Sequence, residues 1–361
     1  MRVVIAGGGT GGHLYPGIAV ARELLARRPD ATVTFAGTAA GIEARVIPRE
    51  GFPLDFLRSG GLKGKSWAAR LRGAALVPLS LLDAWRIVVR RRPDLVIGVG
   101  GYSSGPVVLL AAVRGVPTMV LEQNAVPGLT NRLLARLVQS AGVTFESTRR
   151  FFGPKAFVSG NPVRSEFFGS ARQPGEAGPD AIARVLVFGG SQGAHAINVA
   201  MVEAAPELAA GGPPLHLTHQ TGERDVEMVR AAYRAAGLQA EVEPFLYDMG
   251  QRLGQADVVV SRAGATTLAE IAAAGKAAIL IPLPTATDDH QRKNAEALVA
   301  RGAATLLLQR DMNGRALAER IRTLAVDAVS RERMAAEARR FARPDAAKVI
   351  VDRALELAGA R

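Results

Sequence analysis

The sequence contains no cysteine, so disulfide bonds and thiolate metal sites are excluded. Aromatic residues make up only 5% of its 361 positions, and the basic residues are scattered without a stacking platform or recognition motif, which disfavours nucleic acid as a partner. The amino terminus lacks the basic, apolar and cleavage regions of a signal peptide, so we expect a cytoplasmic protein.

Charged residues account for 22% of the chain and hydrophobic residues for 48%, a profile typical of a globular protein. The length predicts two domains. Lys and Arg number 45 against 33 Asp and Glu, and the resulting net charge of +12 favours anionic partners such as phosphorylated ligands or an acidic membrane face. A general bias towards arginine explains that charge equally well.

Short β-rich segments alternate with longer segments of helical spacing, which predicts an α/β protein with doubly wound parallel sheets. The predicted strands are 3–6, 32–36, 95–99, 118–121, 185–188, 215–219, 258–260 and 278–281.

The chain also contains an internal repeat, because residues 3–13 resemble residues 185–195. Each segment has an apolar strand, a glycine-rich turn and a histidine at the same offset, and each would open one domain. Turn-forming Gly, Asn and Pro residues between them place the boundary near 161, which predicts α/β domains at 1–161 and 162–343.

The first glycine-rich turn, residues 7–12, formally fits the dinucleotide pattern G-x-G-x-x-G, which alone is a weak signal. Such a site needs an acidic residue after the second strand, but residues 34–38 include none, which disfavours an NAD-dependent enzyme. Glycine-rich turns before helices bring backbone N–H groups close to phosphate. This turn, its repeat at 189–193 and a third turn at 261–265 therefore predict sites for phosphorylated ligands.

The third turn leads into a predicted helix that Thr266 or Thr267 would cap. Glu270, about one turn into it, is placed to accept hydrogen bonds from ribose hydroxyls. Taken alone, a carboxylate that only stabilises the first helical turn is the better explanation.

Six motifs, at 8–13, 100–106, 122–124, 160–164, 189–193 and 261–265, follow one another in order along the chain. In this combination the sequence resembles the MurG family, the N-acetylglucosaminyltransferases that complete the lipid-linked disaccharide precursor of bacterial peptidoglycan. The resemblance implies the GT-B fold, with two Rossmann-like domains, a deep cleft between them and a last helix within 344–361 that packs back on the first domain.

The resemblance also implies the reaction. N-acetylglucosamine would pass with inversion from UDP-N-acetylglucosamine, bound mostly by the C-terminal domain, to undecaprenyl-diphosphate-linked N-acetylmuramoyl-pentapeptide, approached from the N-terminal domain. UDP-N-acetylglucosamine is a substrate, so no cofactor is expected, and no metal is predicted as essential. The family works on the cytoplasmic face of the bacterial inner membrane in cell-wall synthesis, and so in cell shape and division.

Residues that match the donor-contacting positions of the family are Thr10, Gly11, Gly12, Asn124, Arg164, Ser191, Leu246, Ala265, Thr266, Thr267, Leu268, Ala269, Glu270 and Gln291. Leu246 would contact the uracil through its backbone. The family often has glutamine before Gln291, where this chain has His290.

His13 is the candidate catalytic base, since imidazole titrates near neutral pH. Capping of its loop, or binding of the acceptor diphosphate, explains it nearly as well. Its counterpart His195 is expected to be structural or adjacent to the donor. Helix N-termini, Ser191 and Arg164 would stabilise charge on the departing UDP. We interpret Asp288-Asp289-His290 as a helix N-terminus rather than a metal site.

The acceptor diphosphate is expected at Gly9, Gly101, Tyr102, Ser103 and Ser104, although a simple β-to-α turn also explains the second of these loops.

Segment 63–86 holds both tryptophans, many aliphatic residues and basic flanks, which is typical of an interfacial patch on anionic lipid. We expect Trp67, Leu76 and Leu79 to be exposed there. The alternative is a core helix.

Other functions fit the same fold. They are a different UDP-sugar transferase with a lipid acceptor, a UDP-sugar epimerase, a nucleotide-binding oxidoreductase and a non-catalytic nucleotide-sugar sensor.

Overall fold

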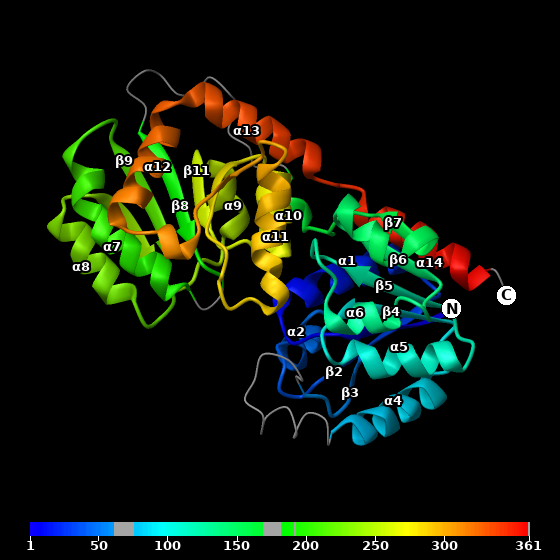
Figure 1. Cartoon of the computed structure of the whole chain (residues 1–361). Coiled ribbons are helices and arrows are strands. Elements are labelled where there is room, and N and C mark those ends of the chain that lie inside the picture. The colour runs from blue at the N-terminus through cyan, green and yellow to red at the C-terminus, as the bar shows by residue number, and fades with distance from the viewer. Residues whose placement is uncertain (61–75, 169–181, 191–192, 360–361) are drawn as a thin grey trace. The chain divides into compact units, whose positions relative to one another are not determined.

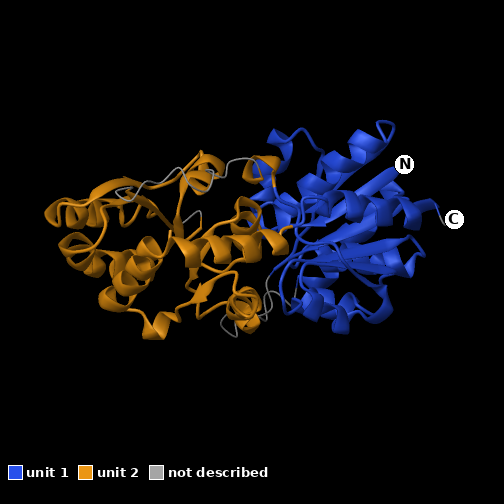
Figure 2. Cartoon of the chain, turned by 90° about the horizontal axis from the view of Figure 1, so that it is seen from above, with its two compact units in different colours: residues 1–163, 343–361 blue, residues 164–342 orange. Residues whose placement is uncertain are grey.

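The computed structural model describes residues 1–60, 76–168, 182–190 and 193–359 (Figure 1). The chain divides into two compact units, coloured separately in Figure 2. The first comprises Met1–Val163 and Arg343–Arg361, and the second comprises Arg164–Ala342. The division after residue 163 compares with a sequence-based boundary at 161.

The first unit is built on a seven-stranded parallel sheet in the order β3-β2-β1-β4-β5-β6-β7. Its strands are β1 (Arg2–Gly7), β2 (Thr32–Gly37), β3 (Leu54–Phe56), β4 (Leu95–Gly100), β5 (Thr118–Glu122), β6 (Ser140–Val143) and β7 (Ala156–Val158). Its helices are α1 (Gly11–Arg27), α2 (Glu43–Arg49), α4 (Val77–Arg91), α5 (Ser104–Val113), α6 (Leu129–Leu134) and α14 (Ala346–Gly359), with 3-10 turns η1 (Glu146–Phe151) and η2 (Gly153–Lys155).

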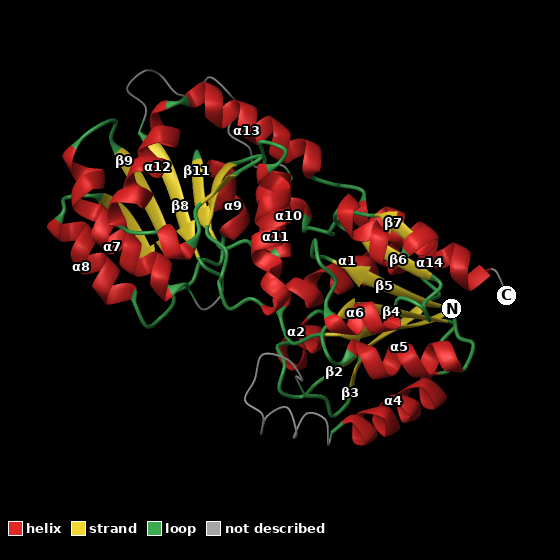
Figure 3. Cartoon of the chain, viewed as in Figure 1, coloured by secondary structure: helices red, strands yellow, loops and turns green. Residues whose placement is uncertain are grey.

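Helices cover both faces of this sheet, because alternate residues of each strand point to opposite sides (Figure 3). Val3 and Ile5 of β1 lie in a core with α1 and α14. Val4 and Ala6 lie in the other core, with α4 and α5. The last helix of the chain therefore completes the first unit rather than the second.

The second unit has a six-stranded parallel sheet in the order β10-β9-β8-β11-β12-β13. Its strands are β8 (Ala183–Phe188), β9 (Leu215–Gln220), β10 (Gln239–Glu243), β11 (Val258–Ser261), β12 (Ala277–Leu280) and β13 (Thr305–Leu306). Its helices are α7 (His195–Ala210), α8 (Val226–Ala235), α9 (Met249–Gln255), α10 (Ala265–Ala274), α11 (His290–Val299), α12 (Gly314–Val326) and α13 (Ala328–Phe341), with 3-10 turns η3 (Ser165–Phe167), η4 (Thr287–Asp289) and η5 (Gln309–Asp311).

All the strands predicted from sequence are present, each within two residues of its predicted ends. The strands not predicted from the sequence are β3, β6, β7, β10 and β13, which are short or lie towards the edges of the sheets. In both sheets the strand order reverses next to the first strand of the unit, β1 or β8, which is the arrangement of Rossmann-like folds.

Candidate functional site

Two glycine-rich loops lie together at the carboxyl edge of the first sheet. One follows β1 and the other follows β4, and these paired strands flank the point where the strand order reverses. Ligands of open α/β sheets bind at such a point. The loops touch, because a Cβ atom on Gly101, whose φ is 81°, would lie 2.6 Å from the carbonyl oxygen of Gly8. Only glycine allows both the conformation and the contact.

His13, the candidate base, stands in the first turn of α1 and contacts both loops. Its Nδ1 atom is 3.3 Å from the hydroxyl of Thr10, the exposed N-cap residue of that helix. On the other side its ring lies on Gly100, where a Cβ atom would come within 2.7 Å of the ring. The ring is half-buried and is therefore held in place with one part still open. Gly11 and Gly12 begin α1, so N–H groups of the helix N-terminus lie at the same loop.

A buried carboxylate, which the sequence analysis missed, fixes the first loop. Glu43 accepts hydrogen bonds from the backbone N–H of Gly9 and from the N–H and hydroxyl of Thr38, each at 2.8 Å. Cβ atoms on Gly8 and Gly41 would lie 2.4 and 2.1 Å from the carboxyl group, so glycine makes room for it. Burial alone would raise the pKa of Glu43, but the hydrogen bonds outweigh it and hold that pKa below its ordinary value.

This contact changes the expected role of Gly9. Gly9 was predicted to lie at the acceptor diphosphate, but its N–H group is already donated to Glu43. The negative charge of the carboxylate also opposes a phosphate at this position. The helix N-termini that lie at the two loops, each with its positive dipole end, are those of α1 and α5.

The second loop leads into α5, and the residues predicted there to bind the acceptor diphosphate differ in their exposure to solvent. Tyr102 is exposed, whereas Ser103 and Ser104 are buried. The Ser104 hydroxyl donates to the carbonyl oxygen of Gly101 at 2.9 Å. The hydroxyl therefore closes the loop, and the contact of Ser104 with the acceptor diphosphate stays a prediction.

Asn124, a predicted donor contact, follows β5 and is held by a second buried carboxylate. Glu122 accepts hydrogen bonds from the backbone and side-chain N–H groups of Asn124 at 3.0 and 3.2 Å, from Gly128 at 3.0 Å and from Asn131 at 2.9 Å. Burial raises the pKa of Glu122, and these hydrogen bonds act against that shift. The amide of Asn124 is thus fixed at the sheet edge that carries both glycine-rich loops.

In the second unit, Gln220 at the end of β9 joins two regions predicted to bind the donor. Its side-chain N–H donates to the carbonyl oxygen of Gly190 at 2.8 Å, in the repeat of the glycine-rich turn. Its Oε1 atom accepts the backbone N–H of Leu246 at 3.4 Å. The side chain of Leu246 is buried, so only its backbone is placed to meet a ligand. Ser191 lies outside the described residues.

Helix α10 starts at Ala265, and its N-cap is Gly264 without a capping side chain. Thr266 and Thr267 therefore lie in the first turn, and the prediction that one of them caps the helix was wrong. Ala265, Leu268 and Ala269 are buried. The contribution that these buried residues can make to a ligand is the N–H groups and positive end of the helix.

Two side chains of α11 fasten the turn before α10. Gln291 accepts the backbone N–H groups of Ala263 at 3.3 Å and Leu283 at 3.0 Å. Asn294 donates to the carbonyl oxygen of Ala263 at 3.3 Å. Gln291 therefore lies beside the turn that precedes α10, and its side-chain carbonyl oxygen holds that turn in place.

Helix α11 begins at His290, directly after Asp288 and Asp289, as the sequence predicted. Both aspartates have positive φ, 56° and 55°, a conformation that Asp tolerates better than most residues. Among the described residues, no group of three or more His, Asp or Glu side chains is arranged to hold a metal ion.

The structure brings Arg164 and Glu270 together. Arg164 precedes η3, which packs on α10. Its guanidinium group lies 3.2 Å from the Glu166 carboxylate and 5.0 Å from the centre of the Phe167 ring. Burial raises the pKa of Glu270 to about 7, with the charge of Arg164 acting against the shift and that of Glu166 adding to it. Glu270 as a whole residue is half-buried.

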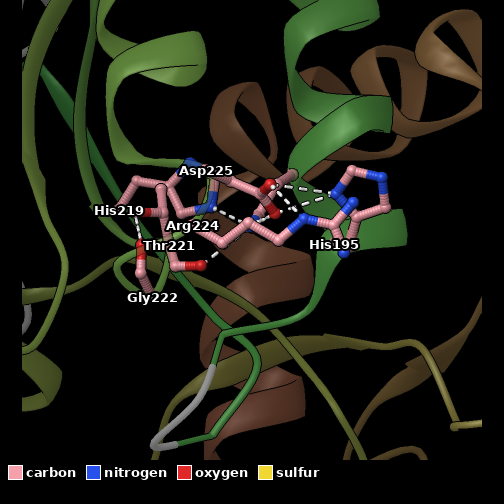
Figure 4. A network of polar contacts seen from close by, with 7 residues as sticks. His195, His219, Thr221, Gly222, Arg224 and Asp225 are labelled. Carbon is pink, nitrogen blue, oxygen red and sulfur yellow. Dashed lines mark hydrogen bonds and ion pairs between the residues drawn. The ribbon is translucent and has the colours of Figure 1, made fainter.

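His195 takes part in a polar network at the start of α7 (Figure 4). Its Nδ1 atom is 2.9 Å from the Asp225 carboxylate, to which Asn198 donates at 2.8 Å. Asn198 also contacts Nε2 of His219 at 3.1 Å, and Nδ1 of His219 lies 2.8 Å from the Tyr233 hydroxyl. Burial lowers the pKa of His219 to about 3 and raises that of Tyr233, so both are neutral at physiological pH. The network holds the start of α7 to the residue that precedes α8.

Helix α4 has an exposed apolar face. Leu79 is 38% exposed, and Leu82 and Trp85 are each 44% exposed. Leu76, which was expected to be exposed, is half-buried, and Trp67 lies outside the described residues. None of the helices in the described part of the chain is both long and apolar enough to cross a membrane.

Comparison with known proteins identifies both halves of the chain. Residues 3–143 match the glycosyltransferase family 28 N-terminal domain, and residues 184–350 match the glycosyltransferase family 28 C-terminal domain. The UDP-N-acetylglucosamine--N-acetylmuramyl-(pentapeptide) pyrophosphoryl-undecaprenol N-acetylglucosamine transferase of Anaeromyxobacter sp. (strain K) is 49% identical, over 99% of this chain and 93% of its own length. The protein of the same name from Pelobacter propionicus is 48% identical over 98% of this chain and 99% of its own.

Solved structures of other proteins also resemble this chain. The crystal structure of Acinetobacter baumannii MurG matches with a TM-score of 0.80 and 32% identity, covering 98% of this chain and 99% of that one. A UDP-GlcNAc 2-epimerase from Neisseria meningitidis, at 16% identity and a TM-score of 0.68 over 99% of this chain and 100% of that one, shares the fold alone. The predicted α/β fold with two Rossmann-like domains is thereby confirmed, and the chain belongs to glycosyltransferase family 28 and, within it, to the MurG family.

Proposed function

We propose that this chain transfers N-acetylglucosamine from UDP-N-acetylglucosamine to the C4 hydroxyl of undecaprenyl-diphosphate-linked N-acetylmuramoyl-pentapeptide. The observation that carries the proposal is the glycine-rich loop before a helix N-terminus at the strand-order reversal of each sheet. Both substrates contain a diphosphate, and this arrangement suits a diphosphate. The names of the relatives supply the sugar and the lipid.

The second unit would hold the donor. The N-terminus of α10 and the guanidinium group of Arg164 would stabilise the negative charge that builds on the UDP diphosphate as it leaves. Glu270 would accept hydrogen bonds from the ribose hydroxyls. The N-terminus of α10 and Arg164 would supply the positive charge that a metal ion provides in other transferases, so we propose no cofactor.

The first unit would hold the acceptor, with its diphosphate at the N-termini of α1 and α5. His13 would take the proton of the C4 hydroxyl as its oxygen attacks C1 of the donor sugar. The bond from C1 to the UDP oxygen breaks on the opposite face, and UDP departs with that electron pair. Attack from the opposite face inverts C1 and gives a β1,4-linked disaccharide on the lipid.

UDP release from UDP-N-acetylglucosamine tests this function. We expect release only when the lipid-diphosphate-muramoyl acceptor is present, because the sugar needs the acceptor hydroxyl as its nucleophile. A nucleotide-coupled assay with and without acceptor measures it. Equal release in both reactions, or conversion of the donor into its 2-epimer, would contradict the proposal.

Donor binding should depend on pH through Glu270. The ionised carboxylate accepts ribose hydroxyls, but a pKa near 7 leaves it largely protonated in acid. Affinity for UDP-N-acetylglucosamine should therefore fall about tenfold from pH 8 to pH 6. Titration calorimetry at several pH values measures this, and it suits this ligand because both ends of its diphosphate are esterified.

The matched control is Glu270→Gln, which keeps the shape but does not titrate. We expect weaker binding overall and a flat pH profile between 6 and 8. A wild-type profile that is equally flat would show that Glu270 is already ionised, or that it does not touch the ribose.

We further propose that the protein works at the cytoplasmic face of the inner membrane, which the apolar face of α4 would contact. Replacing Leu79 with glutamate should weaken binding to anionic phospholipid vesicles about tenfold, since a buried leucine contributes roughly 1.5–3 kcal/mol. Vesicle sedimentation measures this. Val329→Glu is the control, because Val329 is 76% exposed on α13 of the second unit. Equal effects of the two substitutions would exclude α4 as the contact.

A further inference from the structure

An apolar pocket of about 220 Å³ lies among α4, α5 and α6 of the first unit. Figure 1 shows these helices beside one another, and α5 packs against both α4 and α6. The pocket is lined by Ser59, Gly60, Leu76, Val77, Ser80, Tyr102, Gly105, Pro106, Leu109, Leu129, Thr130, Leu133, Leu134 and Leu137. We propose that it binds the hydrocarbon units of the acceptor lipid that adjoin its diphosphate, an inference that rests on the proposed function.

The chemistry of the walls selects the class of ligand. None of the lining residues that belong to the described part of the chain carries a charge, although charged residues make up 22% of the chain. The polar side chains of these described walls are the hydroxyls of Ser59, Ser80, Tyr102 and Thr130, so a sugar, a nucleotide or a peptide would bury most of its polar groups without partners, which costs free energy. A hydrocarbon chain would instead gain about 25 cal/mol for each Å² of apolar surface removed from water.

The position of the pocket connects it to the acceptor loop. Tyr102 and Gly105 belong both to the pocket wall and to the loop and first turn of α5, whose N-terminus is the proposed diphosphate site. A chain bonded to a diphosphate there would continue directly into the pocket. Val77, Leu133 and Leu137, also in its wall, are 41%, 69% and 44% exposed, so the pocket opens at an apolar surface.

The size of the pocket indicates how much of the lipid it takes. Pockets that enclose a whole small ligand measure roughly 300–1,000 Å³. A volume of about 220 Å³ therefore holds only the first units of a long polyprenyl chain. The rest of the chain stays in the bilayer, towards which the exposed residues of α4 lead.

Ser80 provides an internal check on the nature of the ligand. Its side chain is buried in the pocket wall, and within the described residues its hydroxyl has no hydrogen-bond partner. A hydrocarbon ligand offers it none. Ser80→Ala should therefore leave the affinity of a prenyl ligand unchanged or increase it, whereas a polar ligand bound to this hydroxyl would lose affinity.

Binding of farnesyl diphosphate and of inorganic pyrophosphate to the full chain tests the pocket. We expect farnesyl diphosphate to bind at least about tenfold more tightly than pyrophosphate. The reason is that its hydrocarbon chain would bury roughly 60 Å² or more of apolar surface, which is enough to account for a tenfold difference in affinity. Leu109→Trp, which fills the pocket, should remove that advantage without changing pyrophosphate binding. Val113→Trp is the control, because Val113 lies one turn further along α5, is 71% exposed and does not line the pocket.

Leu133→Asp, at the exposed rim, provides a second variant if Leu109→Trp lowers the melting temperature. It should also remove the advantage of the prenyl ligand. The pocket assignment is overturned if farnesyl diphosphate binds no better than pyrophosphate, if Leu109→Trp and Val113→Trp have the same effect, or if Ser80→Ala weakens prenyl binding.

Kinetics separate failure of this inference from failure of the proposed function. Leu109→Trp should raise KM for the polyprenyl acceptor about tenfold and leave KM unchanged for an acceptor with a methyl group in place of the chain. Absence of transfer by the wild-type enzyme to either acceptor would remove the proposed function. Transfer by the wild type, with no difference between Leu109→Trp and Val113→Trp, would remove only the pocket.

Discussion

Replacing His13 with alanine is expected to lower kcat by about 10²–10⁴-fold and to leave the affinity for UDP-N-acetylglucosamine within about twofold of the wild type. The imidazole would accept the proton of the attacking hydroxyl, and its ring is held between Thr10 and Gly100 for that purpose. Initial rates of acceptor-dependent UDP release give kcat, and calorimetry gives the donor affinity.

The same experiment separates the two roles considered for His13. A base mainly affects kcat, whereas a residue that holds the acceptor diphosphate mainly affects the acceptor KM. His195→Ala is the matched control, because His195 occupies the same offset in the second unit but is bound to Asp225. It should cost stability and little turnover. Near-normal turnover of His13→Ala would remove His13 as the base.

Replacing Glu43 with alanine is expected to lower the free energy of unfolding by about 3 kcal/mol and acceptor-dependent turnover by about 100-fold. The substitution leaves the N–H groups of Gly9 and Thr38 without their acceptor and opens a void beneath the first loop. The loop carries His13 at its end, so even a small displacement affects the reacting groups. Denaturant unfolding and steady-state kinetics below the melting transition measure the two effects.

Two variants make this test specific. Glu43→Gln keeps the volume but turns one acceptor oxygen into a donor, so its losses should be intermediate. Glu50→Ala removes a carboxylate at the end of the same helix, where Glu50 forms a surface ion pair with Arg22, and should cost about 1 kcal/mol or less. Full turnover in Glu43→Ala would show that the loop does not depend on this carboxylate.

The strands that could be predicted from the sequence are those whose own residues form a recognisable apolar run. β1, β4 and β5 of the first sheet are buried almost throughout, and they appear as continuous apolar runs. β6 reads Ser-Ala-Gly-Val and β10 reads Gln-Ala-Glu-Val-Glu, compositions that do not favour strands. These segments pair because a neighbouring strand and the connections on either side place them there, which the local sequence does not reveal.

In the candidate site, too, the features formed by neighbouring residues could be predicted from the sequence, and those that depend on distant residues could not. The glycine-rich turns could be predicted, because a turn and the helix after it are contiguous in sequence. Glu43 could not, since it acts on Gly9, which lies 34 residues away. The one available signal was the pair Gly37 and Gly41, which lie close before it and leave space for its carboxyl group. The misassigned cap of α10 has a local cause, because Gly264 is itself an acceptable N-cap.

In the proposed reaction, the sugar of UDP-N-acetylglucosamine ends on a diphosphate-linked lipid. Incubation of the purified chain with radiolabelled UDP-N-acetylglucosamine and the lipid-linked muramoyl-pentapeptide, followed by solvent partition, tests it directly. We predict that label enters the lipid phase in step with UDP formation, in a β1,4-linked disaccharide. Label that stays in the aqueous phase as free sugar or as an altered nucleotide sugar, while UDP or the donor is consumed, would contradict the account.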